Sequence, residues 1–147
     1  MTRHRAPPDS AVSIEVEIPF HDVDLLQVAW HGHYSKYLEL ARTSLLRSRR
    51  LDAADMLALG YRFYVTESHI RHVFPLRYAE LLRVSAWFHD VENRLDIAYD
   101  LFNLTHGRRC AQASTLLVTT TAEGTLCLAT PDPLLERLRA AGPGQAP

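Results

Sequence analysis

Residues 18–46 read IPFHDVDLLQVAWHGHYSKYLELARTSLL, and this stretch decides the fold. An apolar run ends at Phe20, the carboxylates Asp22 and Asp24 follow, and an amphipathic helix begins at His31 or His33. The stretch is therefore a junction between a strand and a helix. The first turn of a helix leaves backbone N–H groups without partners and carries partial positive charge. A carboxylate beside such amides could attack a carbonyl that they hold, or direct water onto it.

The segments on either side of this junction show clear periodicities. Before it, residues 12–20 alternate apolar and polar side chains, which predicts a half-buried strand that frays at Pro19 or lies at a sheet edge. The long helix is predicted to run to Arg49. A short second helix follows, with Asp52 as its N-cap and Gly60 as its end. Further strands are predicted at 61–74, 81–90, 95–104, 109–121 and 125–129, and a last helix at 132–140.

This order of elements predicts an α+β fold in which an antiparallel sheet curls around one long helix. Sequential antiparallel strands need only short turns, and the sequence offers such turns. One helix cannot cover both faces of the sheet, so the outer face or an edge is expected to pair with another subunit. Residues 12–141 are expected to form a single domain, with flexible tails at 1–11 and 142–147.

Composition sets limits on the class of protein. The chain has 147 residues, 47% hydrophobic and 22% charged, with a formal net charge of −1. These values favour one soluble cytoplasmic domain. A net charge this close to zero gives no overall electrostatic attraction to nucleic acid or to a membrane surface. No apolar run has membrane-spanning length, and no secretory signal is expected. Cys110 and Cys127 lack the spacing of a zinc site and are predicted to be buried, inert thiols.

The loop before the helix holds the candidate chemical groups. Asp22 and Asp24 could both be ordinary loop carboxylates, but the apolar residues 25–30 could place Asp24 in a partly dry site that raises its basicity. His31 and His33 invite a metal interpretation, which is disfavoured because no further spaced ligands are seen. A neutral positioning role suits a histidine at a helix start better. Gly32 would let a ligand approach the backbone closely.

These residues carry a resemblance to a known family. The motifs Phe20-His-Asp-Val-Asp24, Val28-Ala-Trp-His31-Gly-His-Tyr34, Tyr37-Leu-Glu39 and Ala41-Arg42 resemble the signature of hotdog-fold acyl-CoA thioesterases. The match is to the 4-hydroxybenzoyl-CoA thioesterase branch, including the thioesterases associated with the Tol-Pal system. The resemblance covers roughly residues 12–128. The same motifs also resemble those of thioesterase-like proteins from aryl polyene, polyketide and fatty-acid gene clusters. Such proteins would act on acyl chains that are bound to acyl carrier protein.

The resemblance implies roles for individual residues. Asp24 matches the catalytic carboxylate, as nucleophile or general base, and His31 matches the histidine at the helix start. The backbone amides around His31 and Gly32 match the group that polarises the thioester carbonyl, and Tyr34 matches a site tyrosine. The residues implied in substrate binding are Gln27, Trp30, Gly32, His33 and Tyr34. Two of them depart from the family pattern: Gln27 stands in place of glycine, and His33 in place of asparagine.

Three functions remain open from the sequence. The first is a thioesterase for acyl-CoA or acyl-carrier-protein substrates, which needs no metal or redox cofactor and forms a homodimer or homotetramer. The second is a non-catalytic protein that binds acyl thioesters or acyl carrier protein, motivated by Gln27 and His33. The third is a metal-dependent hydrolase that uses His31 and His33, whose activity chelators would abolish.

Overall fold

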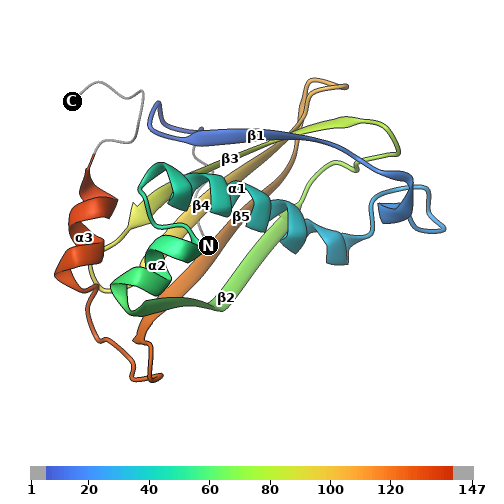
Figure 1. Ribbon diagram of the computed structural model, residues 1–147. Helices are drawn as coiled ribbons and strands as arrows, with labels where there is room; N and C mark the ends of the chain where they lie inside the picture. The colour runs from blue at the N-terminus through green and yellow to red at the C-terminus, as the bar shows by residue number, and fades with distance from the viewer. Residues whose placement is uncertain (1–5, 141–147) are drawn as a thin grey trace.

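A computed structural model describes residues 6–140, so residues 1–5 and the predicted tail at 142–147 lie outside the described part of the chain. Five antiparallel strands form one sheet in the order β1-β3-β4-β5-β2 (Figure 1). The strands are β1 (Val12–Glu17), β2 (Tyr61–His72), β3 (Leu81–Asp90), β4 (Leu95–Asn103) and β5 (Arg108–Thr121). β2 therefore lies at the edge of the sheet beside β5, although it is the second strand in chain order.

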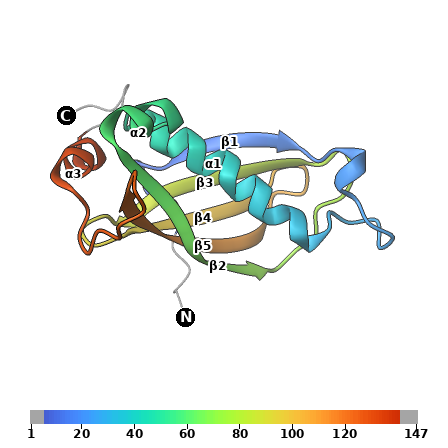
Figure 2. The ribbon, with the colours of Figure 1, turned by 60° about the horizontal axis from the view of Figure 1, so that its bottom comes forward.

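Helix α1 (Tyr34–Ser48) lies along one face of this sheet (Figures 1 and 2). Its apolar side chains recur every three or four residues, and Tyr37, Leu38 and Leu45 are at most 1% exposed. They share one core with inward-facing strand residues such as Leu82 and Ile97. The predicted α+β fold, an antiparallel sheet wrapped around one long helix, is confirmed. None of the helices within residues 6–140 is long and apolar enough to cross a membrane.

The shorter elements end where the sequence provides a stop. β1 ends at Glu17, two residues before Pro19, and a 3-10 turn η1 (Phe20–Asp22) follows. Helix α2 (Ala53–Leu59) has a capping box at its start, in which Asp52 accepts a hydrogen bond from the N–H of Ala53. It ends at Gly60, whose φ of 82° is available to glycine without strain. Helix α3 (Asp132–Arg139) closes the described chain.

Three predictions needed correction. Residues 125–129 do not form a strand: Leu126 makes a single bridge to Thr120, because β4 already pairs with β5 up to Leu117 and leaves little free edge. The regular helix begins at Tyr34, after a 3-10 turn η2 (His31–His33). Cys110 is buried as predicted, whereas Cys127, in the segment that is not a strand, is only half-buried.

Candidate active site

Asp24 lies in a tight hairpin, residues 23–29, which precedes the start of α1 in sequence. The loop after β1 meets the start of α1 at one end of the molecule (Figure 1). Val23 bridges Ala29, the N–H of Asp24 donates to the carbonyl of Val28 at 3.0 Å, and the N–H of Gln27 donates back to Asp24 at 2.9 Å. The turn closes only because Gln27 adopts a φ of 65°. This left-handed conformation favours glycine, which gives a physical reason for a glycine in the family pattern.

The carboxylate of Asp24 is half-buried and partly engaged. Its Oδ1 accepts a hydrogen bond from the N–H of Leu26 at 2.8 Å, and the hydrogen bonds described for residues 6–140 leave Oδ2 without a partner. The expectation that the apolar residues 25–30 give Asp24 a partly dry site stays a prediction, since only some of them pack inward: Ala29 is 5% exposed. Leu25 and Leu26 are 101% and 79% exposed, so both point into solvent. One oxygen of Asp24 is therefore accessible to a ligand or water.

Two backbone amides at the start of η2 are unbonded. Within the described part of the chain, no hydrogen bond leaves the N–H of His31 or Gly32, and the first bonded amide is that of His33, which donates to the carbonyl of Trp30 at 2.9 Å. Such free amides at a helix start attract a developing negative charge. The predicted polarising group is thus available in the structure.

Trp30 packs directly on the backbone of Gly32. A Cβ atom at Gly32 would lie 2.3 Å from the indole ring, so only glycine leaves room for the ring in this position. The indole is 46% exposed, and its centre lies 5.3 Å from the rings of both His31 and His33. The structure therefore gathers these predicted binding residues around the free amides, whereas Gln27 stands exposed at the tip of the hairpin.

Tyr34 lies beneath this group and contacts a residue that sequence reasoning missed. Tyr34 is 3% exposed, and its ring meets that of His72 edge to face at 4.5 Å. Burial, with a contribution from the nearby Cys110 thiol, raises the pKa of Tyr34 far above its usual value. The pKa of His72 is lowered by burial and by the nearby His31. No sequence signal links the end of β2 to the start of α1, so periodicity alone does not place His72 beside Tyr34.

Asp22, which the sequence offers only as a loop carboxylate, is held by residues of α1. Its side chain is buried, and Lys36 Nζ lies 2.7 Å from both of its oxygens. The hydroxyl of Tyr37 donates to Asp22 Oδ2 at 2.6 Å. Burial acts to raise the pKa of Asp22, but the hydrogen bonds from Lys36 and Tyr37 outweigh it, so the pKa lies below its usual value. His33 Nε2 lies 3.9 Å from Asp22 Oδ1, too far for a hydrogen bond.

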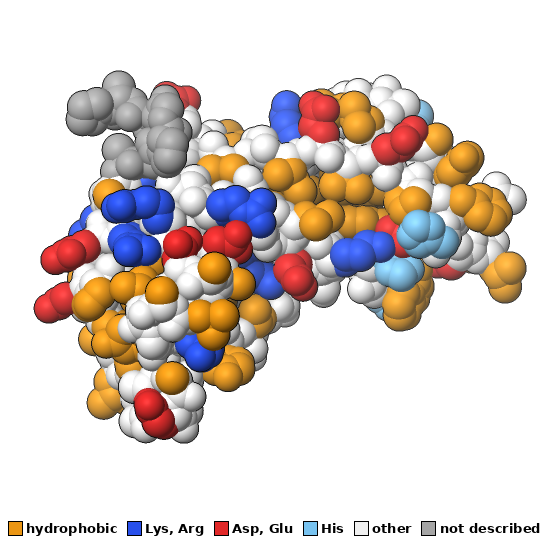
Figure 3. Space-filling view, in the orientation of Figure 1, with side chains coloured by type: hydrophobic (Ala, Val, Ile, Leu, Met, Phe, Trp, Pro, Cys, Tyr) orange, Lys and Arg blue, Asp and Glu red, His pale blue; other side chains and the backbone are white. Residues whose placement is uncertain are grey.

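The surface above these residues is apolar and rich in histidine. Figure 3 shows hydrophobic and histidine side chains together at the end of the molecule where the loop after β1 meets α1. The large exposed hydrophobic side chains there include Phe20, Leu25, Leu26 and Trp30. Nowhere in residues 6–140 do three or more His, Cys, Asp or Glu side chains come together as a metal site would require.

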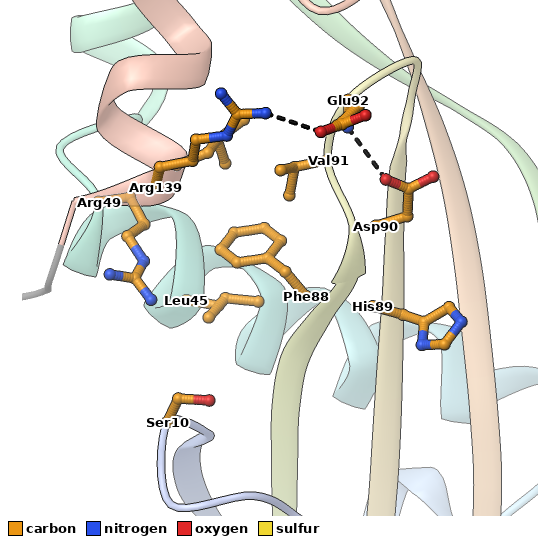
Figure 4. A pocket seen from close by; sticks show the side chains of 10 residues that line it. Ser10, Leu45, Arg49, Phe88, His89, Asp90, Val91, Glu92 and Arg139 are labelled. Atoms are coloured by element: carbon orange, nitrogen blue, oxygen red, sulfur yellow. Dashed lines mark hydrogen bonds and ion pairs between the residues drawn. The ribbon is translucent and has the colours of Figure 1, made fainter.

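A separate cavity of about 320 Å³ lies at the opposite end of α1. Figure 4 shows Phe88 facing it, with Arg49 on one side and the ion pair of Arg139 and Glu92 on another. It contains none of the predicted site residues and mixes cations with carboxylates. The hairpin and the start of α1 therefore remain the candidate active site.

A curved antiparallel sheet around one long helix is the arrangement of the hotdog class. The chain belongs to the Thioesterase-like superfamily, whose model matches residues 18–138.

Two curated relatives and a solved structure are similar to this chain. The chain is 29% identical over 106 residues to sll0410 of Synechocystis sp., named as a candidate esterase, and 26% identical over 90 residues to YneP of Bacillus subtilis, named as a candidate acyl-CoA thioesterase. These matches cover 71% and 60% of this chain, and the chain spans about two thirds, 64% and 65%, of those relatives. The DHNA-CoA thioesterase of Staphylococcus aureus superposes with a TM-score of 0.74, 23% identity and 80% coverage of both chains. That likeness confirms the hotdog fold.

Proposed function

We propose that this protein hydrolyses acyl thioesters. Two observations carry the proposal: Asp24 has an oxygen without a partner, and the amides of His31 and Gly32, a few residues further along the chain, are unbonded. The thioester carbonyl would be held by these amides, and Asp24 would attack it or activate a water molecule. As charge develops on the carbonyl oxygen, each well-placed amide would contribute about 3 kcal/mol of transition-state stabilisation. No metal or redox cofactor is required for this step.

The surrounding residues suit an acyl thioester. Trp30 and the exposed Leu25 and Leu26 offer apolar contact for the chain entering the site, while the buried Tyr34 forms its floor. Coenzyme A esters are the favoured substrates, because the curated relative YneP is named as a candidate acyl-CoA thioesterase. Acyl-carrier-protein thioesters carry the same reacting group and are the second choice. The Tol-Pal-associated branch and the aryl polyene, polyketide or fatty-acid pathways remain proposed settings.

A homodimer or homotetramer is part of the proposal. β2 has 12 residues and, within residues 6–140, pairs with β5 alone. Its residues Tyr64 and Val65 are 55% and 44% exposed. A long edge strand with exposed apolar side chains invites pairing with another strand. A second copy of the chain on this edge would cover that surface. It would also bring further side chains towards the start of α1, because Tyr34 of α1 contacts His72 of β2.

The test is release of free thiol from short-chain, long-chain and aromatic acyl-CoA esters by the wild type and by Asp24→Asn, with and without EDTA. We expect turnover that falls at least 100-fold in Asp24→Asn and ignores EDTA. Glu15→Gln, an exposed carboxylate change on β1, is the matched control and should leave the rate unchanged. Loss of thiol release in the presence of EDTA would favour the metal-dependent hydrolase. Binding without turnover, on CoA and carrier-protein esters alike, would favour the non-catalytic binding protein.

A further inference from the structure

Asp22 links the hairpin to the helix through both its side chain and its backbone. Its carboxylate accepts hydrogen bonds from Lys36 and Tyr37, which lie in the first turns of α1. Its backbone carbonyl accepts a hydrogen bond from the N–H of Trp30 at 2.9 Å, across the base of the hairpin. Among the described residues, no other side chain of residues 18–29 is hydrogen-bonded to α1. The two halves of the proposed site therefore meet at this residue.

The environment of Asp22 shows that it is a fixed group rather than a reacting one. Its side chain is 0% exposed, and both oxygens are occupied by hydrogen bonds from α1. Asp24, two residues further on, has a free oxygen. The two carboxylates look equivalent in the sequence, but the structure divides them into a buried structural anion and an accessible one.

Lys36 supplies the charge that makes the burial of Asp22 possible. It is the only lysine among 16 Lys and Arg residues, and it places Nζ 2.7 Å from both carboxylate oxygens. The other titratable groups that face Asp22 are the hydroxyl of Tyr37 and the imidazoles of His21 and His33, with Nε2 atoms 3.7 and 3.9 Å from Oδ1. Removal of one partner from a buried ion pair leaves a costly unpaired charge.

We propose that Asp22 and Lys36 are a positioning pair that sets the place of Asp24 relative to the free amides of His31 and Gly32. The inference rests on the proposed thioester hydrolysis. Asp24 belongs to the hairpin and the two amides belong to the helix start, so their separation depends on how these two units are joined. A misplacement of 1 Å can lower a rate roughly 100-fold. The pair acts through the backbone and does not touch the substrate.

The test compares Lys36→Met, Asp22→Asn and the double variant with the wild type in the thiol-release assay, well below their melting temperatures. In Lys36→Met, Asp22 remains as a buried carboxylate without its cation, so its pKa rises. We expect kcat to fall roughly 10- to 100-fold near pH 9 with KM changed less than about threefold, and to recover towards about pH 6 as Asp22 takes up a proton.

The double variant separates positioning from simple destabilisation. Asp22→Asn with Lys36→Met removes the unpaired charge, so the extra pH dependence should disappear and part of kcat should return. Arg47→Met is the matched control. It removes an exposed ion pair at the far end of α1, in which Arg47 Nε lies 2.8 Å from Asp52 Oδ2, and it should leave kcat unchanged. The positioning pair would be refuted if Lys36→Met kept the wild-type kcat at every pH while Asp24→Asn was inactive. That result would leave the proposed function intact.

A readout without turnover keeps the inference testable if the proposed function fails. Amide NMR titrations should show a further pH-dependent shift of the Gly32 and Asp24 N–H signals in Lys36→Met, beyond the shifts of these signals in the wild type, and the double variant should lack this additional shift. Unchanged signals for both amides would refute the positioning pair, whatever the activity. Wild-type protein without turnover on any thioester would instead refute the proposed function alone.

Discussion

Replacing Tyr37 by Phe should destabilise the fold by an amount that the structure defines. The Tyr37 ring is 0% exposed, and its hydroxyl lies 2.6 Å from the buried Asp22 Oδ2. A hydrogen bond to a charged group contributes about 1.5–3 kcal/mol. Lys36 still contacts both carboxylate oxygens in the variant, so the loss should be about 2 kcal/mol. For a domain of this size, that corresponds to a melting temperature lower by about 4–8 °C.

The assay is urea unfolding followed by circular dichroism, with Tyr64→Phe as the matched control. Tyr64 is 55% exposed, so its loss of a hydroxyl should change the free energy of unfolding by less than about 0.5 kcal/mol. A loss below about 0.5 kcal/mol in Tyr37→Phe would refute the reasoning, because the buried carboxylate would then not depend on this donor.

The effect of Tyr37→Phe should also depend on pH in a definite direction. The pKa of Asp22 is lowered in the folded protein, since the hydrogen bonds from Lys36 and Tyr37 outweigh the opposing effect of burial. The ionised carboxylate therefore stabilises the fold above the pKa of an unfolded aspartate, about 4, and this contribution is lost as the pH falls through the lower folded value. The difference between Tyr37→Phe and wild type should be constant near neutral pH and shrink in acid.

Three further perturbations test other parts of the structure. Gln27→Gly should raise the free energy of unfolding by about 0.5–1 kcal/mol in urea titrations, because glycine relieves the φ of 65°; equal or lower stability would contradict this. Gly32→Ala should displace the Trp30 indole, seen as a change in tryptophan fluorescence, and lower kcat/KM roughly 10- to 100-fold; an unchanged spectrum and rate would count against the packing. With a thiol reagent, Cys127 should react in the native protein, whereas Cys110, whose pKa burial raises to about 12, should react only on unfolding; equal rates would refute this.

Local sequence patterns were enough to predict most of the fold and part of the site. The three- and four-residue spacing of Tyr37, Leu38 and Leu45 marks α1, and the alternation in 12–17 and 95–103 marks β1 and β4. The junction of Asp24 with a helix start is likewise a local signal. These features depend on neighbours within a few residues, so the sequence displays them directly.

The features that were missed depend on turns and on contacts between distant segments. Asp22 and Asp24 would share a face if the segment were a strand, but the 3-10 turn Phe20–Asp22 directs Asp22 towards Lys36 and Tyr37 instead. His72 reaches Tyr34 only because β2 pairs with β5 and ends beside α1. Neither arrangement follows from periodicity, since both require knowing where the chain returns in space.

Neither of the two departures from the family pattern removes a group that the proposed reaction would use. Gln27 adopts the left-handed backbone that glycine would adopt, so the turn keeps its shape at a cost in strain, and its side chain stands in solvent. His33 lies near Asp22 without bonding to it and helps to lower the pKa of that carboxylate. Neither residue occupies the free oxygen of Asp24 or the free amide of Gly32. Both departures are therefore compatible with the proposed hydrolysis.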